Sequence, residues 1–113
     1  MNKYTARGLA EAASKGCFEI IVVTRHPLSA MEEIPPHFYA AATSVSRANG
    51  KERVDFASGG SISFLHPGSD GHRGRQADVL YLDSDIPHTE HDALIKDYRP
   101  CIQTSPIAEI IRP

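Results

Sequence analysis

The stretch Cys17-Phe18-Glu19-Ile20-Ile21-Val22-Val23-Thr24 decides the fold. It is a nearly unbroken run of apolar, largely β-branched residues, which is typical of a strand covered on both faces of a parallel sheet. A second such run is Val79-Leu80-Tyr81-Leu82, and we expect a third core strand at Cys101-Ile102-Gln103. Buried strands of this kind, separated by helical segments, predict the α/β class.

Helical patterns alternate with these strands. Residues 5–13 place alanine and leucine at three-to-four spacing before Gly16, and Pro27 opens a short helix over 28–33. Thr89 can cap a helix that includes residues 92–97. This order of elements predicts a small three-layer sandwich with a short, mainly parallel sheet. The segment 107–113 has no assignment from its pattern.

The pattern changes between the first two strands. Three short strand-like pieces at 43–47, 52–56 and 61–65 are separated by the turn signals Ala48-Asn49-Gly50-Lys51 and Ser58-Gly59-Gly60. They predict an antiparallel hairpin insertion at about residues 43–65. The next segment, 66–76, is rich in glycine, arginine and histidine, and we expect an exposed loop.

Length and composition limit the organisation and the function. With 113 residues, 41% of them apolar, residues 1–113 should form one domain. The net charge of -2 provides no global basic field, so any nucleic acid would be bound locally. Cys17 and Cys101 lie beside apolar residues and are expected to be free thiols in a reducing compartment. No apolar run is long enough to span a membrane, and charged residues interrupt the first fifteen positions, so we expect a cytoplasmic protein with no membrane partner.

Five potential metal ligands lie close together in the sequence. They are Asp83, Asp85, His88, His91 and Asp92. Because carboxylate and imidazole ligands suit manganese, zinc or iron, a divalent metal held by Asp83, Asp85, His88 and His91 would support a hydrolase, either a nuclease or a phosphoesterase. The simpler interpretation has the acids ending a strand and capping a helix, with both histidines solvated. We favour it, with no cofactor, because the spacing matches no recognised ligand motif.

Positive charge gathers in the hairpin segment and the following loop. The candidate phosphate contacts are Arg47, Lys51, Arg53, Arg73 and Arg75. Arginine and lysine side chains in such positions can contact a nucleic-acid backbone at a few points. The alternative is an ordinary solvated hairpin and loop with no partner. No aromatic residues are interleaved with these cations, so stacking on single strands is not expected.

The order of several motifs resembles a known family. Gly59-Gly60-Ser61-Ile62-Ser63-Phe64 is followed by Arg73-Gly74 and by an apolar strand that ends at Asp83. This resembles the ATPase core of phage terminase large subunits and of related helicase-type translocases. Residues 94–106 look like the next helix and a strand ending in the Ser/Thr-rich coupling motif Thr104-Ser105-Pro106. Residues 5–23 look like the helix after a P-loop and the strand that follows it.

The resemblance implies a P-loop-NTPase-like fold with its first strand missing. It makes Asp83 the Walker B acid, but Ser84 stands where a catalytic glutamate normally follows, and no glycine-rich phosphate loop precedes Gly8. We therefore expect a truncated, degenerate and non-catalytic phage-type protein, located in a host cytoplasm. It would act by binding nucleic acid, a phage or host protein, or its own copy. The alternative is the divalent-metal-dependent hydrolase. Because a missing strand would leave apolar strand edges open, we also expect a homodimer.

Overall fold

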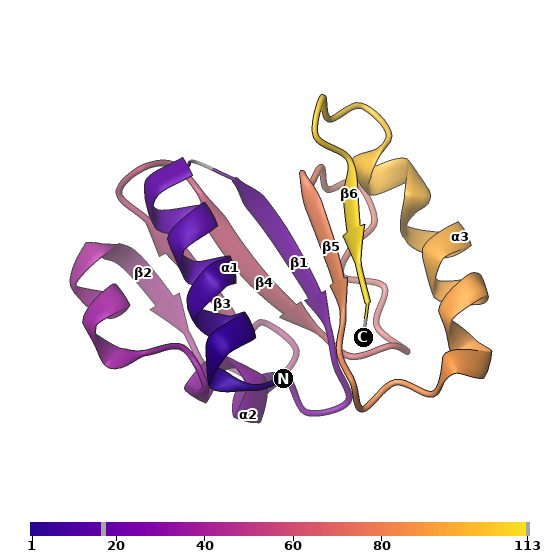
Figure 1. Cartoon of the computed structure of the whole chain (residues 1–113), viewed down its shortest axis with the longest axis horizontal. Helices are drawn as coiled ribbons and strands as arrows, with labels where there is room; N and C mark the ends of the chain where they lie inside the picture. The colour runs from indigo at the N-terminus through magenta and orange to yellow at the C-terminus, as the bar shows by residue number, and fades with distance from the viewer. Residues whose placement is uncertain (17, 113) are drawn as a thin grey trace.

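A single six-stranded sheet organises the chain in the computed structural model, which describes residues 1–16 and 18–112. Helices lie on both of its faces (Figure 1), so the predicted α/β sandwich is confirmed. The elements in chain order are α1 (Lys3–Gly16), β1 (Glu19–Val23), α2 (Pro27–Glu32), the 3-10 helix η1 (Pro36–Ala41), β2 (Ala42–Ser46), β3 (Arg53–Phe56), β4 (Ser61–Leu65), β5 (Val79–Leu82), the 3-10 helix η2 (His88–Glu90), α3 (His91–Ile102) and β6 (Glu109–Ile111).

The strand order is β2-β3-β4-β1-β5-β6. The pairs β4–β1, β1–β5 and β5–β6 are parallel, whereas β2–β3 and β3–β4 are antiparallel. The predicted hairpin insertion forms one side of this sheet, and its last strand, β4, is a parallel neighbour of β1. In register, Ile21 lies opposite Ser63 on one side and Leu80 on the other.

Alternation along the strands divides the core into two layers. Ile20 and Val22 face α1, α2 and η1, whereas Ile21 and Val23 face α3. Helix α3 lies beside β5 and β6, away from β2 and β3 (Figure 1). As a result, no helix of the described residues covers the α3-side face of the sheet at β2, β3 and the start of β4.

The prediction of a third core strand at Cys101-Ile102-Gln103 is wrong. The first two of these residues complete α3, whose buried stripe is formed by His91, Leu94, Tyr98, Cys101 and Ile102. Pro100 lies inside this helix on an exposed position, where the backbone carbonyl that lacks its usual partner can be solvated. The sixth strand is instead β6, in the terminal segment that the sequence pattern left unassigned.

The structure also bears on the expectations for the loop 66–76 and for the two cysteines. The loop 66–76 is largely exposed, but His72 is buried, with its ring stacked on Tyr98 at 4.0 Å between centroids. Cys101 is a free, buried thiol, whereas Cys17 lies outside the described residues. Among the described residues, no helix has the length and apolar character needed to cross a membrane.

Candidate functional site

Two loops meet at the carboxyl ends of β1 and β5. The Thr24 hydroxyl lies 2.8 Å from Asp83 Oδ2 and 3.0 Å from Asp85 Oδ2. Thr24 and Asp83 are almost completely buried. The backbone N–H of Arg25 also donates to Asp85 Oδ2 at 3.0 Å. Residues 24–26 and 83–85 therefore adjoin each other at this edge of the sheet.

The segment Thr104-Ser105-Pro106, which the resemblance places at the end of a core strand, lies elsewhere. The Ser105 hydroxyl donates to Asp78 Oδ1 at 2.7 Å, and Asp78 directly precedes β5. Thr104-Ser105-Pro106 is therefore at the amino end of β5, because the segment before it is helix α3 and no strand carries it across the sheet. No coupling motif joins the Asp83 cluster in this arrangement of the described residues.

Hydrogen bonds and one ion pair occupy most of the Asp83 carboxylate. Its Oδ1 atom lies 2.7 Å from the Met1 amine and accepts the Ser84 N–H at 2.8 Å, while Oδ2 accepts from Thr24. Asp85 Oδ1 is buried with no partner among the described residues. Since Thr24 has one hydroxyl proton, it fully serves only one of the two carboxylates at a time.

The four proposed metal ligands do not come together. His91 turns its Nε2 atom to the backbone carbonyl of Ile86 at 3.2 Å, and the His88 ring packs against that of His91 at 4.6 Å between centroids. Nowhere in residues 1–16 and 18–112 are three His, Cys, Asp or Glu side chains grouped so that they can hold a metal ion. The structure thus pairs Asp83 with Asp85 and separates this pair from the histidines.

The five candidate phosphate contacts are also divided. Arg47 pairs with Glu32 at 3.2 Å and lies over the ring of Tyr39, while Arg73 pairs with Asp70 at 3.4 Å. Lys51 is exposed in the turn between β2 and β3. Only Arg53 and Arg75 converge on one place.

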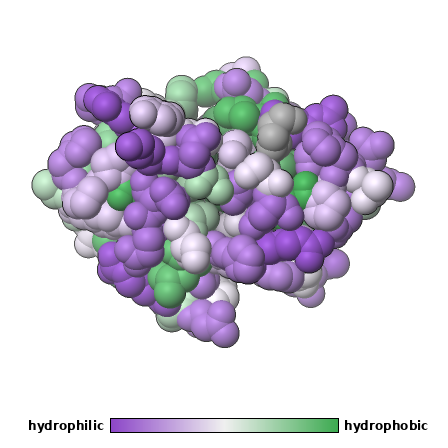
Figure 2. Space-filling view, turned by 60° about the horizontal axis from the view of Figure 1, so that its bottom comes forward, coloured by the Kyte–Doolittle hydropathy of each residue, from purple (hydrophilic) through white to green (hydrophobic). Residues whose placement is uncertain are grey.

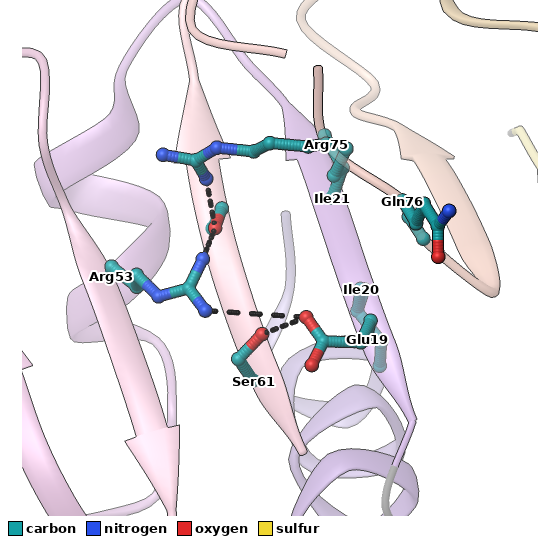
Figure 3. A pocket seen from close by; sticks show the side chains of 9 residues that line it. Glu19, Ile20, Ile21, Arg53, Ser61, Arg75 and Gln76 are labelled. Carbon is teal, nitrogen blue, oxygen red and sulfur yellow. Dashed lines mark hydrogen bonds and ion pairs between the residues drawn. The ribbon is translucent and has the colours of Figure 1, made fainter. Parts of the chain in front are cut away.

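Arg53 and Arg75 meet over the uncovered part of the sheet (Figure 3). Arg53 Nη1 donates to Ser63 Oγ at 2.8 Å, and Arg75 Nη1 donates to the same oxygen at 2.7 Å. They border a cavity of about 280 Å³, which we call the arginine pocket. Its lining residues are Glu19, Ile20, Ile21, Arg53, Ser61, Ser63, Arg75, Gln76 and Ala77.

Strand register explains why these side chains adjoin. Ser63 is the direct cross-strand neighbour of both Arg53 and Ile21, so the three side chains share one face. Ser61 is likewise the neighbour of both Asp55 and Glu19. Two adjacent cross-strand rows, centred on Ser63 and Ser61, therefore contribute to the lining of the arginine pocket.

The charges in the arginine pocket are only partly balanced. Arg53 pairs with Asp55 at 2.9 Å and lies 4.0 Å from Glu19 Oε2. Arg75 makes no ion pair with any residue that the structure describes. Its guanidinium also affects α3: burial and Asp97 raise the pKa of the Cys101 thiol, and the charge of Arg75 lowers it. Arg75 thus contacts the sheet through Ser63 and lines a second cavity together with Asp97 and Cys101 of α3.

Sequence reasoning selected both arginines but missed Glu19, Ser61 and Ser63. A signal for the serines was present, because Ser61 and Ser63 alternate with Ile62 and Phe64 in a predicted strand, which is typical of a strand with one polar face. Glu19 was the one charged residue in the first strand run. No family of proteins, no curated protein and no solved structure matches this chain significantly.

Proposed function

We propose that this chain acts by binding the phosphate backbone of a nucleic acid at the arginine pocket, without catalysing a reaction. The observation that carries the proposal is the convergence of Arg53 and Arg75 on Ser63. Guanidinium groups bind phosphate through fixed, paired N–H donors. Ser63 accepts both of these hydrogen bonds and has no acceptor for its own proton among the described residues. Because Ser63 is buried, its hydroxyl serves to hold the two guanidinium groups beside each other.

The exposed apolar residues give little support for a hydrophobic protein interface. The exposed large apolar residues are Tyr4, Leu28 and Ile107, which come from three separate segments of the described chain. The end of the molecule where β1, β4 and β5 finish is mainly hydrophilic, with small hydrophobic areas (Figure 2). Hydrophobic protein interfaces usually need a larger continuous patch.

The resemblance to terminase and helicase cores stays a prediction. It is supported by the β3–β4 hairpin that precedes an Arg-Gly loop and by the position of Asp83 at the carboxyl end of β5. The alternative, a divalent-metal-dependent hydrolase, has less support because His91 is engaged with Ile86 and only Asp83 and Asp85 adjoin.

A homodimer also stays a prediction, but the expected open edges of the apolar strands, on which it was based, are absent from the described sheet. Strand β1 is paired with β4 and β5, and β5 is paired with β1 and β6, so neither of these apolar strands is an open edge. The remaining edge on that side is the short strand β6. A dimer formed by strand pairing would use one of the two edge strands, β2 or β6. Light scattering at high micromolar concentration would give its mass.

Replacing Arg75 by alanine tests the proposed binding. Arg75 is exposed and its hydrogen bond to Ser63 is the one it makes among the described residues, so the fold should tolerate the change. We expect at least a tenfold loss of affinity for a labelled single-stranded oligonucleotide at low salt, measured by fluorescence anisotropy.

Arg47→Ala is the matched control, because it removes the same charge from the hairpin without touching the arginine pocket. It should change the affinity much less. Equal losses in the two variants would show diffuse attraction and overturn the proposed site. Undetectable binding of the unmodified protein would overturn the nucleic-acid function and favour a protein partner.

A further inference from the structure

The arginine pocket has an acceptor side as well as a donor side. We propose that it recognises a ribose-phosphate unit, and that the chain therefore binds RNA in preference to DNA; this inference rests on the proposed function. The donor side consists of Arg53 and Arg75, which Ser63 holds beside each other. The acceptor side is the carboxylate of Glu19, which is held beside Arg53 by the cross-strand packing of β1 and β4.

Glu19 is positioned by two contacts. Its Oε2 atom accepts the Ser61 hydroxyl at 2.8 Å and lies 4.0 Å from Arg53 Nη2 (Figure 3). Its Oε1 atom accepts no hydrogen bond from the residues that the structure describes, and the side chain is 43% exposed. The carboxylate is thus fixed at one oxygen and available at the other.

The donor side and the acceptor side of the arginine pocket bind different chemical groups of one ligand. A carboxylate accepts hydrogen bonds and repels phosphate, so the group that meets Glu19 must be a neutral donor such as a hydroxyl. Arg53 contacts both Ser63 and Glu19, which places the phosphate-binding and hydroxyl-binding sides next to each other. In RNA the 2′-hydroxyl is on the carbon adjacent to the one that carries the 3′-phosphate. DNA lacks this donor, and the 2′-hydroxyl is the group that distinguishes the two nucleic acids.

The lining residues also indicate that the bases are not read. The lining contains no aromatic side chain on which a base could stack. Recognition through sugar and phosphate alone positions a strand without reading its sequence. We therefore expect a preference for RNA that is the same for different base sequences.

The experiment compares RNA and DNA oligonucleotides of one sequence by fluorescence anisotropy. We expect the unmodified protein to bind RNA about tenfold more tightly, the effect of one hydrogen bond to a charged group. Oligonucleotides with 2′-O-methyl groups lack the donor and should bind as weakly as DNA. Equal affinity for RNA and DNA would overturn the inference while leaving the proposed function intact. If neither nucleic acid binds, the proposed function itself fails.

Glu19→Ala separates recognition from a structural role. It should abolish the preference for RNA, because the acceptor of the 2′-hydroxyl is lost and RNA binding weakens. DNA binding should stay equal or become stronger, because the carboxylate no longer repels phosphate. A residue that only holds Arg53 in place would lower both affinities by the same factor, and that result would also overturn the inference. Glu11→Ala is the matched control, since Glu11 is an exposed carboxylate on α1, outside the lining of the arginine pocket. It should leave the preference unchanged.

Discussion

Tyr98 is a tyrosine of α3 with 0% exposure, and its hydroxyl has no hydrogen-bond partner among the described residues. Burial raises the pKa of this hydroxyl far above its ordinary value, and the nearby charge of Asp97 raises it further. A buried hydroxyl without a partner contributes nothing to stability and costs desolvation. Tyr98 therefore stabilises the fold through its ring, which packs in the α3-side core and stacks on His72.

The variant Tyr98→Phe should reveal the raised pKa in the stability of the protein at high pH. Above pH 10 the hydroxyl ionises in the unfolded chain but stays protonated in the folded one, so the unfolded state is favoured as the pH rises. Between pH 9 and 11 the unmodified protein should lose about 1.4 kcal/mol more unfolding free energy than Tyr98→Phe. Urea unfolding at each pH measures this difference. Tyr4→Phe, at a tyrosine that is 76% exposed, is the control. Parallel profiles for Tyr98→Phe and the unmodified protein would contradict the prediction.

The element that depends most on a glycine is the turn between β3 and β4. A Cβ atom at Gly60 would lie 2.1 Å from the backbone oxygen of Ala13 and 2.9 Å from that of Phe18. The turn also contacts α1 through the Ser58 hydroxyl, which donates to the Ala13 carbonyl at 2.8 Å. Gly60 thus allows the start of β4 to approach the end of α1 closely.

Gly60→Ala should lower the unfolding free energy by about 2 kcal/mol, because backbone atoms on both sides must move to admit the methyl group. Gly8→Ala is the opposite case, since Gly8 is exposed within α1 and nothing lies within 4 Å of its added Cβ. That change should raise the unfolding free energy by roughly 0.5–1 kcal/mol. Urea unfolding of both variants measures the contrast, and destabilisation by Gly8→Ala comparable to that by Gly60→Ala would contradict this account of the turn.

Elements with a long or regular pattern were predictable from the sequence. Strands β1 and β5 and the hairpin strands β3 and β4 follow from apolar or alternating runs bounded by turn residues. The end of α3 could not be predicted, because a short apolar run such as Cys101-Ile102 fits a strand or a helix. Strand β6 is only three residues long and is held by pairing with β5, a contact that its own sequence does not encode.

At the scale of the whole molecule, the candidate site depends on tertiary register. All five candidate phosphate contacts could be named from the sequence. The sequence did not show that two of them, Arg53 and Arg75, meet, because sheet pairing and the path of the loop 66–76 bring them together. Arg47 and Arg73 were equally good candidates by composition, yet each has an acidic partner elsewhere. Fewer cations are therefore available to bind phosphate than the number of arginines and lysines indicates.

The salt dependence of nucleic-acid binding measures how many phosphates the protein neutralises. With a net charge of -2, the molecule offers no general attraction, so the counterions released on binding should reflect the phosphates that the arginine pocket neutralises. Two contacts, from Arg53 and Arg75, predict a slope of log affinity against log salt of about -1.4 on single strands, and Arg75→Ala should reduce it to about -0.7. If all five cations bound phosphate, the slope would be about -3.5. Arg47→Ala separates the two cases: it should leave the slope unchanged if the pocket alone binds, because Arg47 is held by Glu32 outside it.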